Sequence, residues 1–180
     1  MKIIILIFIL CLLCGCRIYD LTNFTVPNDT RFLALIESLD TPKKIVEYMG
    51  SFEWNVSFHT YSPYEMYLAN LEGWDDTGDC DDFAAFGAYA ANWHGYITYR
   101  MTMWVKTQIF YGLPLVLPHV ICIYVEDGKY TYSNNSNYIP IFTDTFQNII
   151  NDYLERSPDV RSIVSWKVYD YDMNLVEGGK

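Results

Sequence analysis

Basic side chains are scarce in this chain of 180 residues, which has 12 lysines and arginines against 22 aspartates and glutamates. The net charge of −10 argues against a nucleic-acid partner, because binding to phosphates needs clustered cationic side chains. Long apolar runs are missing as well, since the run over residues 3–14 is too short to cross a bilayer comfortably. The chain has no internal repeat, and its length suits one domain with a core of its own.

The short apolar run has the form of an export signal. Lys2 precedes it, and small residues follow it where a signal is usually processed. The stretch Leu13-Cys14-Gly15-Cys16 resembles a bacterial lipobox. This resemblance implies cleavage before Cys16 and attachment of lipid to its thiol, and several acyl chains anchor a protein stably. An uncleaved signal anchor or an ordinary signal-peptidase site is the alternative.

The sequence therefore predicts three segments. Residues 1–15 form the signal peptide, residues 16–30 form a tether rich in turn formers, and residues 31–180 form the domain. Without Lys2 the mature chain has 11 basic and 22 acidic residues, a net charge of −11. Contact with the membrane would then come from the lipid anchor and not from a basic patch. We expect the protein on the periplasmic or extracellular face of a bacterial membrane.

Few cysteines remain for the domain. Cys11 and Cys14 would leave with the signal, which keeps Cys80 and Cys122. An exported domain can form a disulfide from such a pair. However, Cys122 lies in an apolar run, where a free buried thiol is ordinary.

Hydrophobic periodicity and turn residues predict an α+β domain, with helices first and mostly antiparallel strands afterwards. The expected helices cover residues 32–39, 42–49, 63–71, 79–94 and 145–156. The expected strands cover residues 54–59, 96–106, 119–126, 130–133 and 163–171, with a tight hairpin turn at Asp127-Gly128. The helix after Asp79 is apolar on more than one face and rich in small residues, so neighbouring elements should cover it.

Cys80 stands at the start of that central helix. Unpaired N–H groups in the first turn of a helix favour a thiolate, which is the reactive form of cysteine. Asp79 suits the N-cap position, and Asp82 suits the reciprocal position of a capping box. The same acids oppose a thiolate by repulsion, so the helix start alone would not activate Cys80. A base is needed.

The sequence offers three histidines for this role. His119 stands at the beginning of the most strongly predicted strand, from which it could reach a neighbouring helix start. His59 lies in a loop, and His94 lies several turns along the helix that Cys80 begins. A third group must orient the imidazole, and the partner strand of the hairpin is well placed to supply it. Asn134 is the first choice and Asn135 the second.

Three segments in this order resemble the core of the transglutaminase-like superfamily, above all its bacterial cysteine-peptidase-like members. They are GDCDDFA at residues 78–84, PHV at residues 118–120 and GKYTYSN at residues 128–134. The likeness covers roughly residues 31–140. It implies a papain/transglutaminase-like core in which a nucleophile helix packs on an antiparallel sheet.

The resemblance also implies roles: Cys80 as nucleophile, His119 as general base and Asn134 as the orienting residue. Most members of the family have Asp at the third position. An oxyanion donor is not marked by any motif; Trp54 and Asn55 are weak candidates, and the backbone N–H of Cys80 is the donor that the helix start suggests.

We therefore expect a thiol enzyme that acts on amide bonds of a protein or peptide substrate through a thioester. Water would give hydrolysis and an amine would give transamidation. Neither a cofactor nor a metal is expected. One alternative is a binding module of the cell envelope that keeps the fold without turnover. Another is a cell-wall peptidase of the NlpC/P60 type, although that family usually places Ser and Gly where this chain has Asp81 and Asp82.

Overall fold

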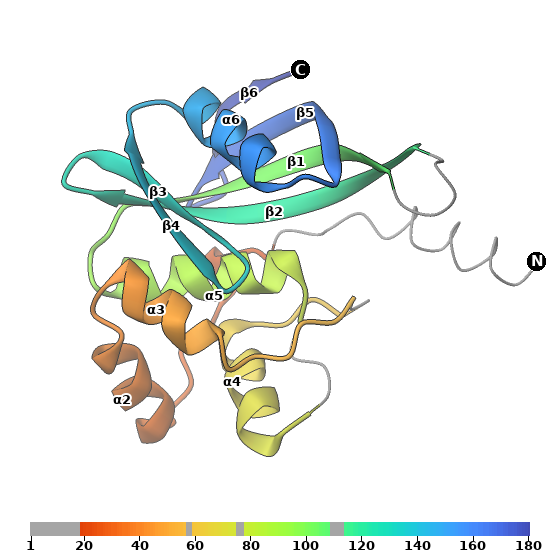
Figure 1. Cartoon of the computed structure of the whole chain (residues 1–180). Helices are drawn as coiled ribbons and strands as arrows, with labels where there is room; N and C mark the ends of the chain where they lie inside the picture. The colour runs from red at the N-terminus through yellow and green to blue at the C-terminus, as the bar shows by residue number, and fades with distance from the viewer. Residues whose placement is uncertain (1–18, 57–58, 75–77, 109–113) are drawn as a thin grey trace, which may run out of the picture.

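The chain folds into helices packed on both faces of one antiparallel sheet (Figure 1). The computed structural model describes residues 19–56, 59–74, 78–108 and 114–180, so the predicted signal peptide and Cys16 lie outside the described residues. The helices are η1 (Leu21–Asn23), α2 (Thr30–Ser38), α3 (Pro42–Met49), α4 (Pro63–Glu72), α5 (Cys80–Trp93) and α6 (Phe146–Arg156). The strands are β1 (Thr98–Gln108), β2 (Pro114–Glu126), β3 (Lys129–Asn134), β4 (Asn137–Thr143), β5 (Val160–Asp170) and β6 (Leu175–Gly179).

These elements form three layers, which makes the domain α+β as predicted. Helix α5 lies against one face of the sheet with α2, α3 and α4 around it, and α6 covers the other face (Figure 1). Each face has its own core cluster. Phe83, Phe86 and other α5 residues belong to the first cluster, whereas Ile149 and Ile150 of α6 belong to the second.

Strand order in the sheet is β4-β3-β2-β1-β5-β6, and every neighbouring pair is antiparallel. β2 pairs with β1 from Pro114 onward, but its pairing with β3 begins only at Cys122. Pro118 is tolerated in β2 because proline lacks a ladder donor and fits where one side of a strand is unpaired. The strand is therefore longer than the predicted 119–126, since its prolines suggested a break.

Helix α5 is buried along its length, as its composition predicted. Its residues from Cys80 to Ala91 are all buried. A side chain at Gly87 would come within 2.5 Å of the Tyr124 hydroxyl on β2, so this position has no space for a Cβ atom. The small residues thus let the helix lie directly on the central strand.

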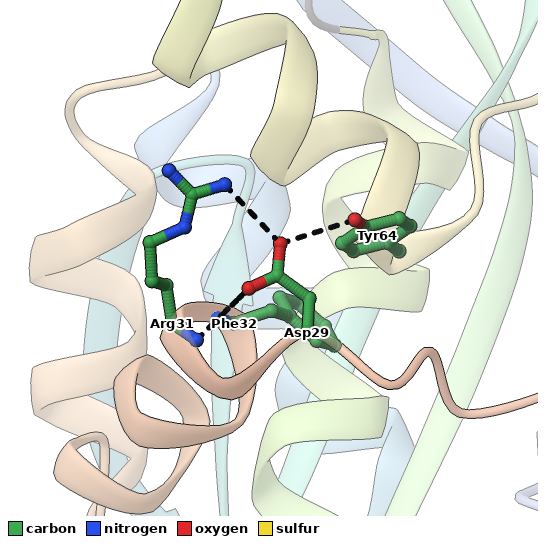
Figure 2. A network of polar contacts seen from close by, with 4 residues as sticks. All are labelled: Asp29, Arg31, Phe32 and Tyr64. Atoms are coloured by element: carbon green, nitrogen blue, oxygen red, sulfur yellow. Dashed lines mark hydrogen bonds and ion pairs between the residues drawn. The ribbon is translucent and has the colours of Figure 1, made fainter.

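Helices α3 and α4 begin at the predicted residues, each directly after its capping residue, whereas α2 begins two residues before the predicted start. Thr41 caps α3, and Ser62 forms a capping box with Glu65 at α4. Asp29 caps α2 by accepting hydrogen bonds from the N–H of Arg31 at 2.9 Å and of Phe32 at 3.4 Å (Figure 2). Its other oxygen accepts the hydroxyl of Tyr64 on α4 at 3.1 Å, so one carboxylate both caps α2 and joins it to α4 (Figure 2).

Residues 19–30, expected as part of a tether, lie against the domain. Leu21 is buried, and the ring of Phe24 stands 5.0 Å from that of Tyr89 on α5. The buried Arg100 of β1 donates a hydrogen bond to the carbonyl of Tyr19. In the described residues, the helices are all too short or too polar to cross a membrane.

Two features of the sheet differ from the sequence analysis. Residues 53–56 form no strand, although 54–59 were expected to, and residues 57–58 lie outside the described part. β4 and β6 were not predicted; β4 follows β3 through a two-residue turn whose Asn135 has a φ of 50°. Asparagine tolerates this left-handed conformation better than most residues, which makes so short a turn possible.

Candidate active site

The start of α5 is built as a capping box around Cys80, as predicted. The side chain of Asp79 accepts the N–H of Asp81, and the carboxylate of Asp82 accepts the N–H of Asp79 at 2.9 Å. Asp82 also accepts the N–H of Tyr61 at 2.7 Å. This second bond was not predicted, because it joins residues 21 positions apart. It ties the loop before α4 to the turn that presents the thiol.

Gly78 is required by this geometry. Its φ is +128°, and an added Cβ would lie 2.7 Å from the Cβ of Asp82. Both the backbone conformation and the contact exclude a side chain. The glycine of the GDC motif therefore makes room for the buried carboxylate that fixes the helix start.

The imidazole of His119 lies between Cys80 and Asn134. Its Nε2 is 2.9 Å from Oδ1 of Asn134, and its side chain is hydrogen-bonded to Cys80. An amide oxygen only accepts, so Nε2 must carry the hydrogen and donate it. This leaves Nδ1 as the nitrogen that can take the proton of the thiol. Asn134 thus selects the tautomer that a base next to Cys80 needs.

The pKa of His119 is raised above its ordinary value. Burial of the half-buried ring lowers it, but the hydrogen bond and negative charge of Cys80 and the bond to Asn134 together raise it more. An imidazole that holds its proton beside sulfur favours the thiolate through the same interaction. The environment therefore offsets the repulsion that a charged Asp79 exerts on a thiolate at Cys80.

Cys80 and His119 reach each other from opposite faces of the sheet. Cys80 belongs to the core cluster on the α5 side, together with Val120 of β2. Ile121 belongs to the cluster on the α6 side, and alternation along β2 places His119 on that side too. His119 precedes the residues of β2 that pair with β3. Before Cys122, β2 does not pair with β3, so this edge of the sheet is open. Side chains from the two faces, such as Cys80 and His119, can therefore meet there.

Tyr153 of α6 covers the imidazole and was missed by the sequence analysis. Its ring centroid is 5.5 Å from that of His119 at an interplanar angle of 30°, and only 5% of the residue is exposed. Burial raises the pKa of Tyr153, as does the nearby charge of Cys80. An apolar ring at this position limits the water around the histidine. The periodicity of α6 indicated that Tyr153 is buried, but could not indicate which residue it contacts.

The other candidate residues lie elsewhere or make other contacts. His94 bonds through Nε2 to the carbonyl of Ile36 at 2.8 Å, at the far end of α5. His59 is exposed in its loop, with Nε2 3.8 Å from a carboxylate oxygen of Glu65. In the part of the chain that the structure describes, the buried Oδ1 of Asn135 has no hydrogen-bond partner. Of the two asparagines considered, Asn134 is the one that bonds to His119.

Cys122 and Cys80 are both free thiols, so the disulfide considered from the sequence does not form. Cys122 lies on β2 and is fully buried. Burial raises the pKa of the Cys122 thiol to about 12. It is therefore an internal reference for an unreactive cysteine.

Asp81 is a buried acid next to the thiol. Burial raises its pKa well above the usual range, and the hydrogen bond to Asp79 and the charges of Asp79, Asp82 and Cys80 raise it further. Asp81 thus keeps its proton near neutral pH and donates it to Asp79.

Asp79, Cys80 and Asp81 also offer possible metal-binding atoms within 4.8 Å of one another. A cation bound by both carboxylates would have to displace the shared proton.

Replacing Asp81 by asparagine is expected to stabilise the protein as pH rises. The folded chain keeps the Asp81 proton while the unfolded chain loses it above about pH 4, so the wild type loses stability with pH. The loss is at most about 1.4 kcal/mol per pH unit. An amide is neutral at every pH and can donate to Asp79 as the acid does.

Urea unfolding at pH 4, 6 and 8 measures this effect. Asp81→Asn should match the wild type near pH 4 and exceed it increasingly above that value. Asp40→Asn is the matched control, because Asp40 is exposed and pairs with Lys44 at 2.8 Å. Parallel curves for wild type and Asp81→Asn would contradict the shared proton.

Comparisons with known proteins give little beyond the geometry. Neither the models of known protein families nor the curated proteins match the sequence. Among solved structures, calcium-bound LapG of Legionella pneumophila is similar at a TM-score of 0.46 and 16% identity, over 76% of this chain and 72% of that one. EGTA-treated LapG of the same organism gives a TM-score of 0.46 and 14% identity, over 82% and 79%. A likeness this distant carries no information on function.

Proposed function

We propose that the protein is a membrane-anchored thiol enzyme of the transglutaminase-like type that acts on amide bonds. Cys80 is the nucleophile, His119 the general base and Asn134 the residue that orients the imidazole. The observation that carries the proposal is the position of His119, which contacts Cys80 and bonds to Asn134 Oδ1 at 2.9 Å. These contacts support a Cys-His-Asn triad, in which a base activates the thiol and a third group orients that base.

The chemistry follows from the assigned tautomer. Nδ1 of His119 takes the thiol proton while the sulfur of Cys80 forms a bond to the amide carbon. The oxyanion that results would be stabilised by the backbone N–H of Cys80 at the start of α5. When the C–N bond breaks, the leaving amine receives the proton from His119, and a thioester remains. Water then releases an acid, or a second amine forms a new amide.

The flanking acids have a structural part in this proposal. Asp79 and Asp82 bond to the backbone around the thiol, and Asp81 shares its proton with Asp79. They hold the helix start in place and leave the base to His119. We also propose that Cys16 carries the lipid anchor, which would put protein or peptide substrates of the cell envelope within reach. Mass spectrometry of the mature N-terminus tests this anchor.

Labelling and turnover test the enzyme directly. At pH 7, iodoacetamide should alkylate Cys80 faster than it alkylates glutathione and should leave Cys122 unmodified. A peptide mixture analysed by mass spectrometry reports hydrolysis, and a biotin-tagged primary amine reports transamidation. Products should form with the wild type and with Cys122→Ala, but not with Cys80→Ala.

If Cys80 reacts no faster than glutathione and neither product forms, the catalytic proposal fails. The chain would then be a binding module of the cell envelope that keeps the fold. Reactivity without either product in a broad peptide mixture would also contradict an enzyme of amide bonds.

A further inference from the structure

The segment before the predicted nucleophile is attached to the turn that presents Cys80. The N–H of Asn55 donates to the carbonyl of Gly78 at 3.1 Å, and the N–H of Tyr61 donates to Asp82 at 2.7 Å. Gly78 and Asp82 stand on either side of Cys80 in the sequence. Residues 55 and 61 are therefore both fixed close to the proposed reaction centre.

Phe52 fixes the beginning of the same segment. It is buried, and its ring centroid lies 5.7 Å from that of Phe83 and 5.1 Å from that of Phe86, both on α5. The segment is thus held by an apolar contact at one end and by a backbone hydrogen bond at Asn55. The contacts of Phe52 and of the Asn55 N–H thus set the backbone position of the segment.

Those two side chains are large, apolar and exposed. Trp54 is 53% exposed and Val56 is 56% exposed. Single apolar residues on a surface are common, but these two flank Asn55, whose N–H is bonded to the turn that presents Cys80. Tryptophan in particular serves as an anchor for ligands, because its ring buries a large apolar area at little conformational cost.

We propose that Trp54 and Val56 contact the substrate and select a polypeptide segment with a large apolar side chain close to the amide that Cys80 attacks. This deepens the proposed function and rests on it. Asn55 is bonded to Gly78, whose Cα atom lies at most about 7 Å from that of Cys80. An extended peptide covers this distance in about two residues, so the selected side chain lies about two or three residues from the amide.

Charge defines the substrate further. Asp79 lies directly before Cys80, and the chain as a whole has a net charge of −10. An acidic peptide would meet repulsion at this site, whereas a neutral or basic one would not. The substrate is then an apolar segment with neutral or basic neighbours.

Peptides that carry a thiol-reactive vinyl sulfone test this proposal on the whole protein. Three probes of equal length have Phe, Ala or Glu at the second residue from the electrophile. Cys80 of the wild type should react with the Phe probe about tenfold faster than with the Glu probe. Trp54→Ala should slow the Phe probe about tenfold and leave the rate with iodoacetamide unchanged.

Trp93→Ala is the matched control. Trp93 is 42% exposed at the opposite end of α5, so its replacement should leave all three probe rates unchanged. Equal rates for the Phe and Glu probes in the wild type would overturn the proposal. An equal loss with iodoacetamide and the Phe probe in Trp54→Ala would overturn it too, since the segment would then act through the position of Cys80.

Two other outcomes would overturn different parts of the proposal. A wild-type Cys80 that reacts with iodoacetamide no faster than glutathione defeats the proposed enzyme itself, before any peptide probe is compared. Sedimentation that shows a dimer which Trp54→Ala dissociates would make this surface an interface between copies of the chain, and would overturn its assignment to substrate.

Discussion

Alanine at position 119 is expected to slow the alkylation of Cys80 at pH 7 by at least about tenfold. An ordinary thiol with a pKa near 8.5 is only a few per cent thiolate at this pH, and a negative charge on Asp79 beside Cys80 would reduce that fraction. His119 counters both effects, because its imidazole contacts the thiol and has a raised pKa. Amide turnover should fall further, by about 100-fold or more, since the general base is lost as well.

The pH profile separates this role from a general loss of structure. In the wild type the alkylation rate should reach half of its plateau well below pH 8.5, because the imidazolium stabilises the thiolate. In His119→Ala the midpoint should move to pH 8.5 or above. His94→Ala is the control, since His94 bonds to Ile36 at the other end of α5. An unchanged midpoint in His119→Ala would contradict the proposed base.

The same alkylation measurement on variants of Asn134 and Asn135 tests the residue that orients the imidazole. Asn134→Ala removes the acceptor of Nε2, so the imidazole loses its fixed orientation and the rate should fall, though less than in His119→Ala. Asn134→Asp keeps an acceptor and should keep most of the rate. Asn135→Ala should leave the midpoint unchanged, because the Nε2 bond goes to Asn134.

Local signals identified the starts of three helices and one tight turn. Thr41, Ser62 and Asp79 each cap the helix that the sequence predicted after them. The Asp127-Gly128 turn also forms, with positive φ at both residues. These features could be predicted because capping and tight turns depend on residues a few positions apart.

Features that depend on distant residues were not predictable in the same way. Trp54 and Val56 alternate with polar residues as in a strand, but the hydrogen bond of Asn55 goes to Gly78 and not to the sheet. The contact of Tyr153 with His119 joins α6 to β2 across the second core cluster. No local pattern carries the information that these pairs meet.

Asp82→Ala is expected to lower the free energy of unfolding by several kcal/mol, more than the other substitutions discussed. Asp82 is 1% exposed, and its two oxygens accept the N–H of Tyr61 at 2.7 Å and of Asp79 at 2.9 Å. Alanine would leave both donors without this acceptor inside the protein, at about 1–3 kcal/mol each. It would also remove a carboxylate from the first turn of α5, which contributes up to about 1 kcal/mol. We expect a loss of about 3–5 kcal/mol in the free energy of unfolding.

Urea unfolding of two further variants tests the cause. Asp82→Asn keeps one acceptor oxygen, but its NH2 group cannot accept a hydrogen bond from the other N–H. Its loss in the free energy of unfolding should therefore be about half that of Asp82→Ala. Asp40→Ala removes an exposed acid that pairs with Lys44, and should cost less than about 1 kcal/mol. An Asp82→Ala variant no less stable than Asp40→Ala would show that Asp82 does not hold the turn. The loop at Tyr61 and the helix start at Cys80 would then keep their positions through packing alone.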